Sequence, residues 1–192
     1  PQPQLLLAIE YLEKRAGQDN PFFAFISFPD PHHPFNPPGK YWDMYAPDEF
    51  TVDLPYDAHE NPIPPMEHAS EMWKAGKMPP IPQMPFRADD QHVLEAKALT
   101  AGMITMIDDH IGRVVQALKD TGQYDNTVII FTSDHGDYLG DFNLMLKGPV
   151  QLPAITRVPM IWSDPDTRAG VRTDAMASTI DISASILDRA GF

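Results

Sequence analysis

Thr127–Thr132 reads TVIIFT and leads directly into Ser133–Asp137, which reads SDHGD. A short run of β-branched and apolar residues without polar alternation predicts a strand buried on both faces, as in a parallel sheet. Upstream, residues 88–121 are predicted to form a helix, because apolar side chains between Met103 and Leu118 recur at i, i+3 and i+4 and Gly122 ends the pattern. A helix that leads into a buried strand is half of an α/β unit.

The alternation of helix and strand continues in both directions along the chain. Apolar spacing predicts one helix near each end, and two further apolar runs, FFAFISF and VPMIW, predict strands. The expected helices cover Leu5–Arg15 and Ser178 or Thr179 to Gly191, and the expected strands cover Phe22–Phe28 and Val158–Trp162. We therefore predict an α/β fold with a mainly parallel sheet flanked by helices.

Residues 29–87 carry most of the chain's 21 prolines and read as one long irregular segment. A structureless connection of this length is uncommon inside a compact domain, and a linker between two domains is the alternative interpretation. The aromatic residues within it favour a segment packed onto a surface: Phe35, Tyr41, Trp42, Tyr45 and Trp73. We therefore predict that residues 1–192 are part of a single domain.

The composition excludes several classes of protein. A formal charge of −13 without a basic stripe argues against nucleic-acid binding. The absence of cysteine excludes disulfides, thiolate metal sites and a cysteine nucleophile within this stretch. No apolar run approaches the roughly 18 residues of a membrane span, and Pro1–Gln4 lack the features of a secretory signal. We expect a soluble protein, either cytoplasmic or periplasmic/secreted, and no feature predicts its oligomeric state.

Two of the predicted strands lead into polar clusters, Pro29–Phe35 (PDPHHPF) and Ser133–Asp137. Ligands of open α/β sheets gather beyond the carboxyl ends of the strands. An acid beside an imidazole at such an end indicates a corner that binds a hard metal ion. Each cluster alone has a plain alternative, because histidines beside proline in turns are often structural and Asp-His-Gly occurs in many loops.

Together the two segments resemble a known family. Pro21–Tyr45, reading PFFAFISFPDPHHPFNPPGKYWDMY, is similar to the histidine-containing segment of type I sulfatases of the alkaline-phosphatase superfamily. Asn126–Pro149, reading NTVIIFTSDHGDYLGDFNLMLKGP, resembles their second metal segment and the lysine that follows it. The resemblance covers nearly the whole chain and implies an incomplete, alkaline-phosphatase-like catalytic domain.

The resemblance assigns roles to four residues. Asp134 and His135 match the pair that coordinates a divalent cation, usually calcium, and His32 matches the histidine that faces the sulfate ester. Lys147, thirteen residues after Asp134, matches the lysine that contacts the sulfate and its bridging oxygen. His33 falls at a variable position and is expected to be structural. A cation and a lysine neutralise a sulfate ester, and a histidine near the bridging oxygen can protonate the departing alkoxide.

Other parts of the family pattern are missing. The family nucleophile is a formylglycine made from a Cys/Ser-x-Pro-x-Arg motif, and the nearest match, Ser27–Pro31, has proline where arginine is needed. The formylglycine and the paired aspartates that complete the metal site belong to an N-terminal segment that this stretch lacks. Asp108 and Asp109 lie inside the predicted helix and are expected to be solvated or to pack. Gly140–Asn143 reads GDFN where the family often has GDHG, which removes a polar contact or repacks the loop.

The predicted activity of the parent protein is hydrolysis of a sulfate monoester of a small molecule or saccharide. A phosphonate or phosphate ester hydrolase on the same fold is the enzymatic alternative. A non-catalytic sulfatase-like fragment is the alternative from a different class. The isolated chain is expected to be inactive, because it lacks the nucleophile.

Overall fold

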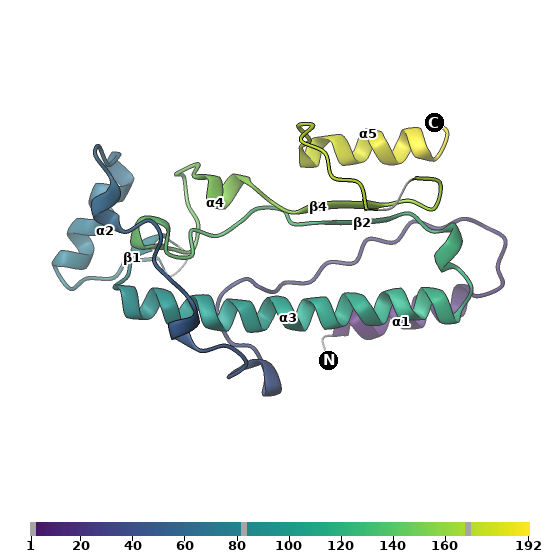
Figure 1. Ribbon diagram of the computed structural model, residues 1–192, viewed down its shortest axis with the longest axis horizontal. Helices are drawn as coiled ribbons and strands as arrows, with labels where there is room; N and C mark the ends of the chain where they lie inside the picture. Colours follow the sequence, from purple (N-terminus) through teal and green to yellow (C-terminus); the bar gives the residue numbers. More distant parts are fainter. Residues whose placement is uncertain (1–2, 82–83, 168–169) are drawn as a thin grey trace.

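The long helix α3 (Asp90–Asp120) runs along most of the length of the molecule (Figure 1). The computed structural model describes residues 3–81, 84–167 and 170–192. Asp89 caps the start of α3 by accepting the backbone N–H of His92 at 3.0 Å, and the chain leaves the helix through Gly122 at a φ of +70°. The helix predicted over residues 88–121 is confirmed, and it buries Met103, Ile107 and Leu118 of the predicted apolar pattern, whereas Ile104 is exposed.

Helix α1 (Pro3–Arg15) packs against the C-terminal half of α3. Leu12 forms a buried cluster there with Ala117 and Leu118 of α3. The side-chain amide of Gln123 donates to the Leu12 carbonyl at 3.0 Å and ties the end of α3 to the same place. The first predicted helix is therefore confirmed, and its apolar spacing reflects this contact.

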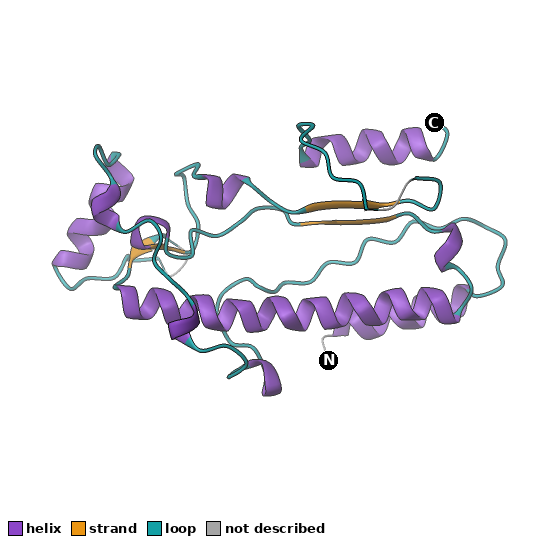
Figure 2. Cartoon of the chain, viewed as in Figure 1, coloured by secondary structure: helices purple, strands orange, loops and turns teal. Residues whose placement is uncertain are grey.

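Two antiparallel ladders make up the strands of the described residues (Figure 2). Strand β2 (Ile129–Thr132) pairs with β4 (Met160–Ser163), and β1 (Phe86–Arg87) pairs with β3 (Leu144–Met145). The α/β class is confirmed, but the predicted parallel direction is wrong for both pairs. Parallel pairing needs a crossover, usually a helix, whereas the only α-helix assigned between β2 and β4 is the four-residue α4 (Pro153–Thr156).

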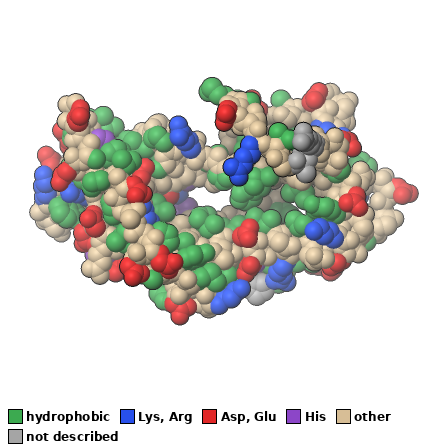
Figure 3. Space-filling view, viewed as in Figure 1, with side chains coloured by type: hydrophobic (Ala, Val, Ile, Leu, Met, Phe, Trp, Pro, Cys, Tyr) green, Lys and Arg blue, Asp and Glu red, His purple; other side chains and the backbone are tan. Residues whose placement is uncertain are grey.

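The predicted strand at Phe22–Phe28 is extended but has no strand assignment. Figure 1 shows this segment running between α3 and the β2–β4 ladder. Phe23 and Phe25 are 70% and 83% exposed, so the burial expected for this run is not found. The space-filling view has an opening between the helical layer and the strand layer (Figure 3). Burial on both faces requires neighbouring strands, and the described residues supply none to this segment.

The proline-rich region is only partly irregular. It contains three short 3₁₀ turns (Gly39–Tyr41, Pro47–Glu49 and Tyr56–Ala58) and one helix, α2 (Pro64–Lys74), which the sequence analysis missed. Pro64 and Pro65 occupy the first turn of α2, where their missing N–H groups cost nothing. The Tyr45 hydroxyl contacts Thr105 Oγ1 at 2.8 Å, so this region packs onto α3 as its aromatic residues indicated.

The C-terminal helix α5 (Thr179–Arg189) lies on the far side of the β2–β4 ladder from α3 (Figure 1). It is confirmed where the sequence predicted it, and Asp181 accepts the Ser178 backbone N–H at 2.7 Å. None of its residues is buried, and Arg189 ties it to Asp164 at 2.7 Å, just after β4. Across the described ranges, no helix has both the length and the hydropathy needed to cross a membrane.

Candidate active site

Asp134 and His135 follow the end of β2 and form a pair. The Asp134 carboxylate is exposed and accepts the backbone N–H of His135 at 2.9 Å. Desolvation acts to raise the pKa of Asp134, but this hydrogen bond and the charge of His135 outweigh it, so the pKa lies below its ordinary value. The carboxylate is therefore ionised at neutral pH and offers its oxygens to a cation.

The imidazole of His135 has a defined orientation. Its Nδ1 lies 2.7 Å from the Gly136 carbonyl, and a carbonyl only accepts, so Nδ1 carries a hydrogen and Nε2 is the ring nitrogen that can coordinate a cation. Nε2 lies 3.7 Å from Oδ2 of Asp134. A nitrogen lone pair beside a carboxylate oxygen fits a divalent cation, so the residues present are compatible with the predicted metal pair.

Gly136 fixes the path of this loop. Its N–H donates to the Ile155 carbonyl at 2.8 Å, and a Cβ at this position would lie 1.8 Å from the Ala154 carbonyl oxygen. Only glycine permits so close an approach to α4. The short helix therefore supports the loop that carries Asp134 and His135.

His32 and His33 stack on each other, with ring centroids 4.0 Å apart and planes at 28°. The His32 Nδ1–H donates to the His33 carbonyl at 2.6 Å, which leaves Nε2 of the exposed His32 ring for proton exchange. The pKa of His33 is lowered, first by burial and then by the positive charges of His32 and Lys147. His33 thus lies within electrostatic reach of the two predicted substrate residues, His32 and Lys147. Its structural role stays a prediction.

Lys147 lies on a loop that Tyr138 holds on both sides. The backbone N–H of Tyr138 donates to the Leu146 carbonyl at 2.7 Å, just before the lysine. The Tyr138 hydroxyl donates to the Val150 carbonyl at 2.9 Å and accepts the Val150 N–H at 3.1 Å, just after it. Tyr138 is only 1% exposed, so these bonds are shielded from water and define where Lys147 stands.

Asp137 lies within electrostatic reach of residues from both polar clusters, Pro29–Phe35 and Ser133–Asp137. The sequence analysis assigned Asp137 no role. Burial raises the pKa of its carboxyl, and the positive charges of Lys147, His135 and His32 oppose that rise. Its Oδ1 accepts the Leu139 N–H at 3.0 Å. Three of the four predicted site residues therefore act on one half-buried carboxylate. The place of Asp137 within SDHGD was the sequence signal that could have identified it. The sequence analysis used only Asp134 and His135 of this segment, because only they matched the family pattern.

The chain also matches known proteins along its whole length. The family model for sulfatases matches residues 4–192. The chain belongs to the sulfatase family. It is 33% identical to an uncharacterized sulfatase of Escherichia coli (strain K12) over 91% of its own length, and 32% identical to an arylsulfatase of Clostridium perfringens over 94%. It spans 33% and 36% of those two proteins, about a third of each.

Solved structures give the same fold. A phosphonate monoester hydrolase from Silicibacter pomeroyi superimposes with a TM-score of 0.76 at 29% identity, over 99% of this chain and 38% of that one. The alkaline-phosphatase-like α/β fold is therefore shown, in an incomplete form. The unpaired Phe22–Phe28 segment fits a chain that covers only part of such a fold.

The departure from the sulfatase pattern at residues 140–143 repacks the loop. The Phe142 ring stacks on His59 of the proline-rich region, with centroids 3.6 Å apart. The buried Asn143 accepts the Tyr56 N–H at 2.8 Å and donates to Asp90 at 2.7 Å. These side chains join the proline-rich region to the start of α3. Neither His32 nor Lys147 is a partner in these hydrogen bonds.

Of the acidic pair Asp108 and Asp109, Asp109 contacts the proline-rich region. Asp109 accepts hydrogen bonds from Lys40 at 2.8 Å and from the Tyr41 hydroxyl at 2.6 Å, on the surface of α3. Within residues 3–81, 84–167 and 170–192, no three histidines or acids are grouped to hold a metal ion. Asp134 and His135 are thus the only predicted ligand pair that the described structure brings together.

Proposed function

We propose that the complete protein containing this chain hydrolyses a sulfate monoester, R–O–SO₃⁻, to an alcohol and sulfate. The proposal is supported by the match of the sulfatase family model to residues 4–192, together with the electrostatic influence of Lys147, His135 and His32 on the Asp137 carboxyl. The substrate is a small-molecule or saccharide sulfate. Its anionic group requires positive charge, and this cluster supplies it within an otherwise acidic chain of net charge −13.

Asp134 and His135 are the residues that would hold a divalent cation, which we propose to be calcium. Such an ion supplies charge neutralisation for the sulfate oxygens. Calcium prefers six to eight oxygen ligands, so this pair provides only part of its coordination. The other ligands and the formylglycine nucleophile are assigned to the part of the protein outside these 192 residues.

The chain's own residues divide the remaining work. Lys147 places a compact positive charge against the sulfate oxygens. His32 donates its Nδ1–H to the His33 carbonyl, which orients Nε2, and in the protonated ring Nε2–H transfers its proton to the bridging oxygen as the alcohol departs. Asp137 provides a carboxyl group within electrostatic reach of Lys147 and His135.

The leaving group of the ester tests this division. His32→Ala should lower kcat/KM by about 10²–10⁴ for esters of alcohols that leave poorly, and far less for an activated aryl sulfate. Lys147→Ala should weaken hydrolysis of both kinds, because its charge meets the sulfate itself. His92→Ala, at an exposed histidine near the start of α3, is the control. Equal dependence on alcohol pKa in wild type and His32→Ala would remove His32 from the role of acid.

The second candidate is a phosphonate or phosphate ester hydrolase. The likeness to the phosphonate monoester hydrolase from Silicibacter pomeroyi favours it, since that protein superimposes over 99% of this chain. Parallel kinetics with 4-nitrophenyl sulfate and 4-nitrophenyl phenylphosphonate on the complete protein separate the two. A kcat/KM that is higher for the phosphonate would replace the sulfatase assignment.

A further inference from the structure

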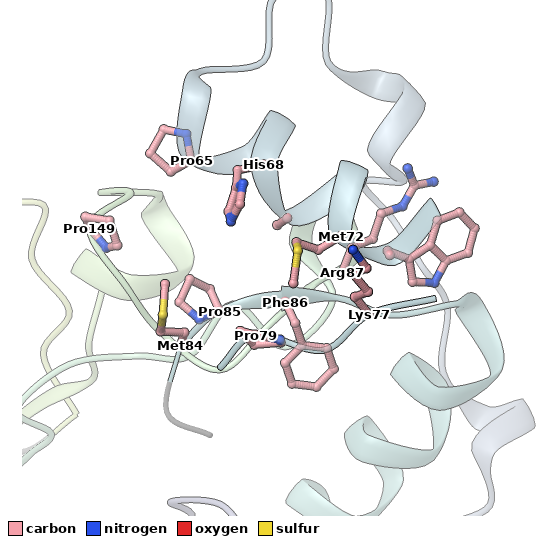
Figure 4. A pocket seen from close by; sticks show the side chains of 12 residues that line it. Pro65, His68, Met72, Lys77, Pro79, Met84, Pro85, Phe86, Arg87 and Pro149 are labelled. Carbon is pink, nitrogen blue, oxygen red and sulfur yellow. The ribbon is translucent and has the colours of Figure 1, made fainter. Parts of the chain in front are cut away.

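A cavity of about 90 Å³ lies between α2 and the segment that leads into β1 (Figure 4). Its walls are mainly apolar and include Met72, Pro85 and Phe86. His68 and Met72 project from α2 toward the segment below it, where Pro85 precedes Phe86 of β1. The cavity is smaller than the roughly 150 Å³ that encloses a benzene ring, so it takes part of a ring and leaves the rest outside.

The polar groups around this cavity are all basic. His68, Lys77 and Arg87 line it, and no acid does so among the residues that the structure describes. Acidic side chains outnumber lysine and arginine by 27 to 14 in the whole chain, so this local balance is reversed. In the same described part of the chain, none of the three forms a salt bridge. The walls of the cavity therefore carry basic side chains that no acid of the described residues neutralises through a salt bridge.

Arg87 is held in a fixed place. Its guanidinium lies between the rings of Tyr56 and Trp73, 4.1 and 4.4 Å from their centroids, and donates to the Ser70 hydroxyl at 2.7 Å. This stack also orients the Trp73 ring at the cavity wall. Lys77 differs, because it is exposed and its ammonium group makes no hydrogen bond to the described residues, although its backbone N–H donates to the Met72 carbonyl at 2.9 Å. Lys77 is thus the basic group that can reorient toward a ligand.

The cavity borders the loop of the proposed active site. Pro149 lines it and follows Lys147 by two residues, so their Cα atoms are at most about 7.6 Å apart. Gly148 between them packs against Pro85, where a Cβ would come within 2.7 Å of the ring. A molecule whose ester group meets Lys147 can therefore reach the cavity with a neighbouring ring.

We propose that this cavity is a subsite for the organic part of the substrate, and that it selects a ring that bears a second negative group, such as a carboxylate. The ring lies against the apolar wall and the second anion meets Lys77. This assignment of substrate class rests on the proposed function, whereas the binding of a ring-bearing anion at the cavity does not.

Binding of 4-methylbenzoate to the complete protein tests the subsite without catalysis. Calorimetry on Lys77→Gln should give a Kd about fivefold above wild type, while Lys74→Gln, at a neighbouring exposed lysine that does not line the cavity, should match wild type. Wild type should bind the neutral analogue 4-methylbenzamide more weakly than 4-methylbenzoate. Lys77→Gln should bind these two ligands with equal Kd. No binding to wild type, or equal Kd values for all three proteins, would overturn the subsite.

Lys147→Ala separates the cavity from the ester site. Binding of 4-methylbenzoate should survive this change, and weakening by Lys147→Ala but not by Lys77→Gln would place the anion at the ester site and overturn the proposal. Kinetics with 4-nitrophenyl sulfate and 4-(sulfooxy)benzoate then test the substrate class. Lys77→Gln should raise KM only for the carboxylated ester. If neither ester is hydrolysed but the binding results hold, the proposed function fails and the subsite stands.

Discussion

Removal of one hydroxyl group, in Tyr138→Phe, should loosen the loop that carries Lys147. The hydroxyl donates to the Val150 carbonyl and accepts the Val150 N–H, and both residues are buried, at 1% and 6% exposure. The change leaves the buried N–H of Val150 without a partner, whereas the Val150 carbonyl still accepts the Leu152 N–H at 3.0 Å. One such group costs about 1–3 kcal/mol, so we expect a loss of about 1–3 kcal/mol of stability.

Urea denaturation of the complete protein, followed by tryptophan fluorescence, measures this loss. Tyr124→Phe is the matched control, because the Tyr124 hydroxyl makes no side-chain hydrogen bond to the described residues. Tyr138→Phe should also raise KM for a sulfate ester, since the loop that carries Lys147 would no longer be held from both sides. A Tyr138→Phe protein within about 0.5 kcal/mol of the control would refute the role given to this hydroxyl.

Three further predictions concern packing, pH and metal. Gly102→Ala should destabilise the protein by about 1–3 kcal/mol in thermal melts, because its Cβ would lie 2.2 Å from the Tyr41 carbonyl oxygen, whereas Gly112→Ala meets nothing within 4 Å and should be neutral or stabilising. The hydrogen bond from Arg189 lowers the pKa of Asp164 to about 2, so its contribution is present above pH 3.8 and is lost toward pH 2; Arg189→Met should remove that pH-dependent step in α5 protection by hydrogen exchange. Calorimetry on the isolated chain should detect no micromolar calcium binding, because Asp134 and His135 alone cannot coordinate the ion.

Local sequence patterns were sufficient for three of the helices. α1, α3 and α5 lie where apolar spacing and glycine stops predicted them, because these signals act within a few turns of one helix. The pattern failed at α2, where the abundance of proline indicated a loop. Proline is compatible with the first turn of a helix, and Pro64 and Pro65 occupy that turn.

Composition alone did not decide the strands. The apolar run Phe22–Phe28 predicted burial on both faces, yet Phe25 is 83% exposed. Burial of a strand depends on neighbours that come from elsewhere in the sequence. Strand direction has the same origin, since β2 and β4 become antiparallel through the return of the chain between them.

The sequence by itself determined which chemical groups the protein has, through the segments PDPHHPF and SDHGD and the lysine that follows them. Only the tertiary structure decided that Lys147 and His32 come within electrostatic reach of the half-buried Asp137, and that three basic side chains line an apolar cavity that Pro149 also lines. The physical reason is that burial and electrostatic interaction depend on distance in space. Residues far apart in the chain acquire those distances only when α3, the loops and the proline-rich region pack together.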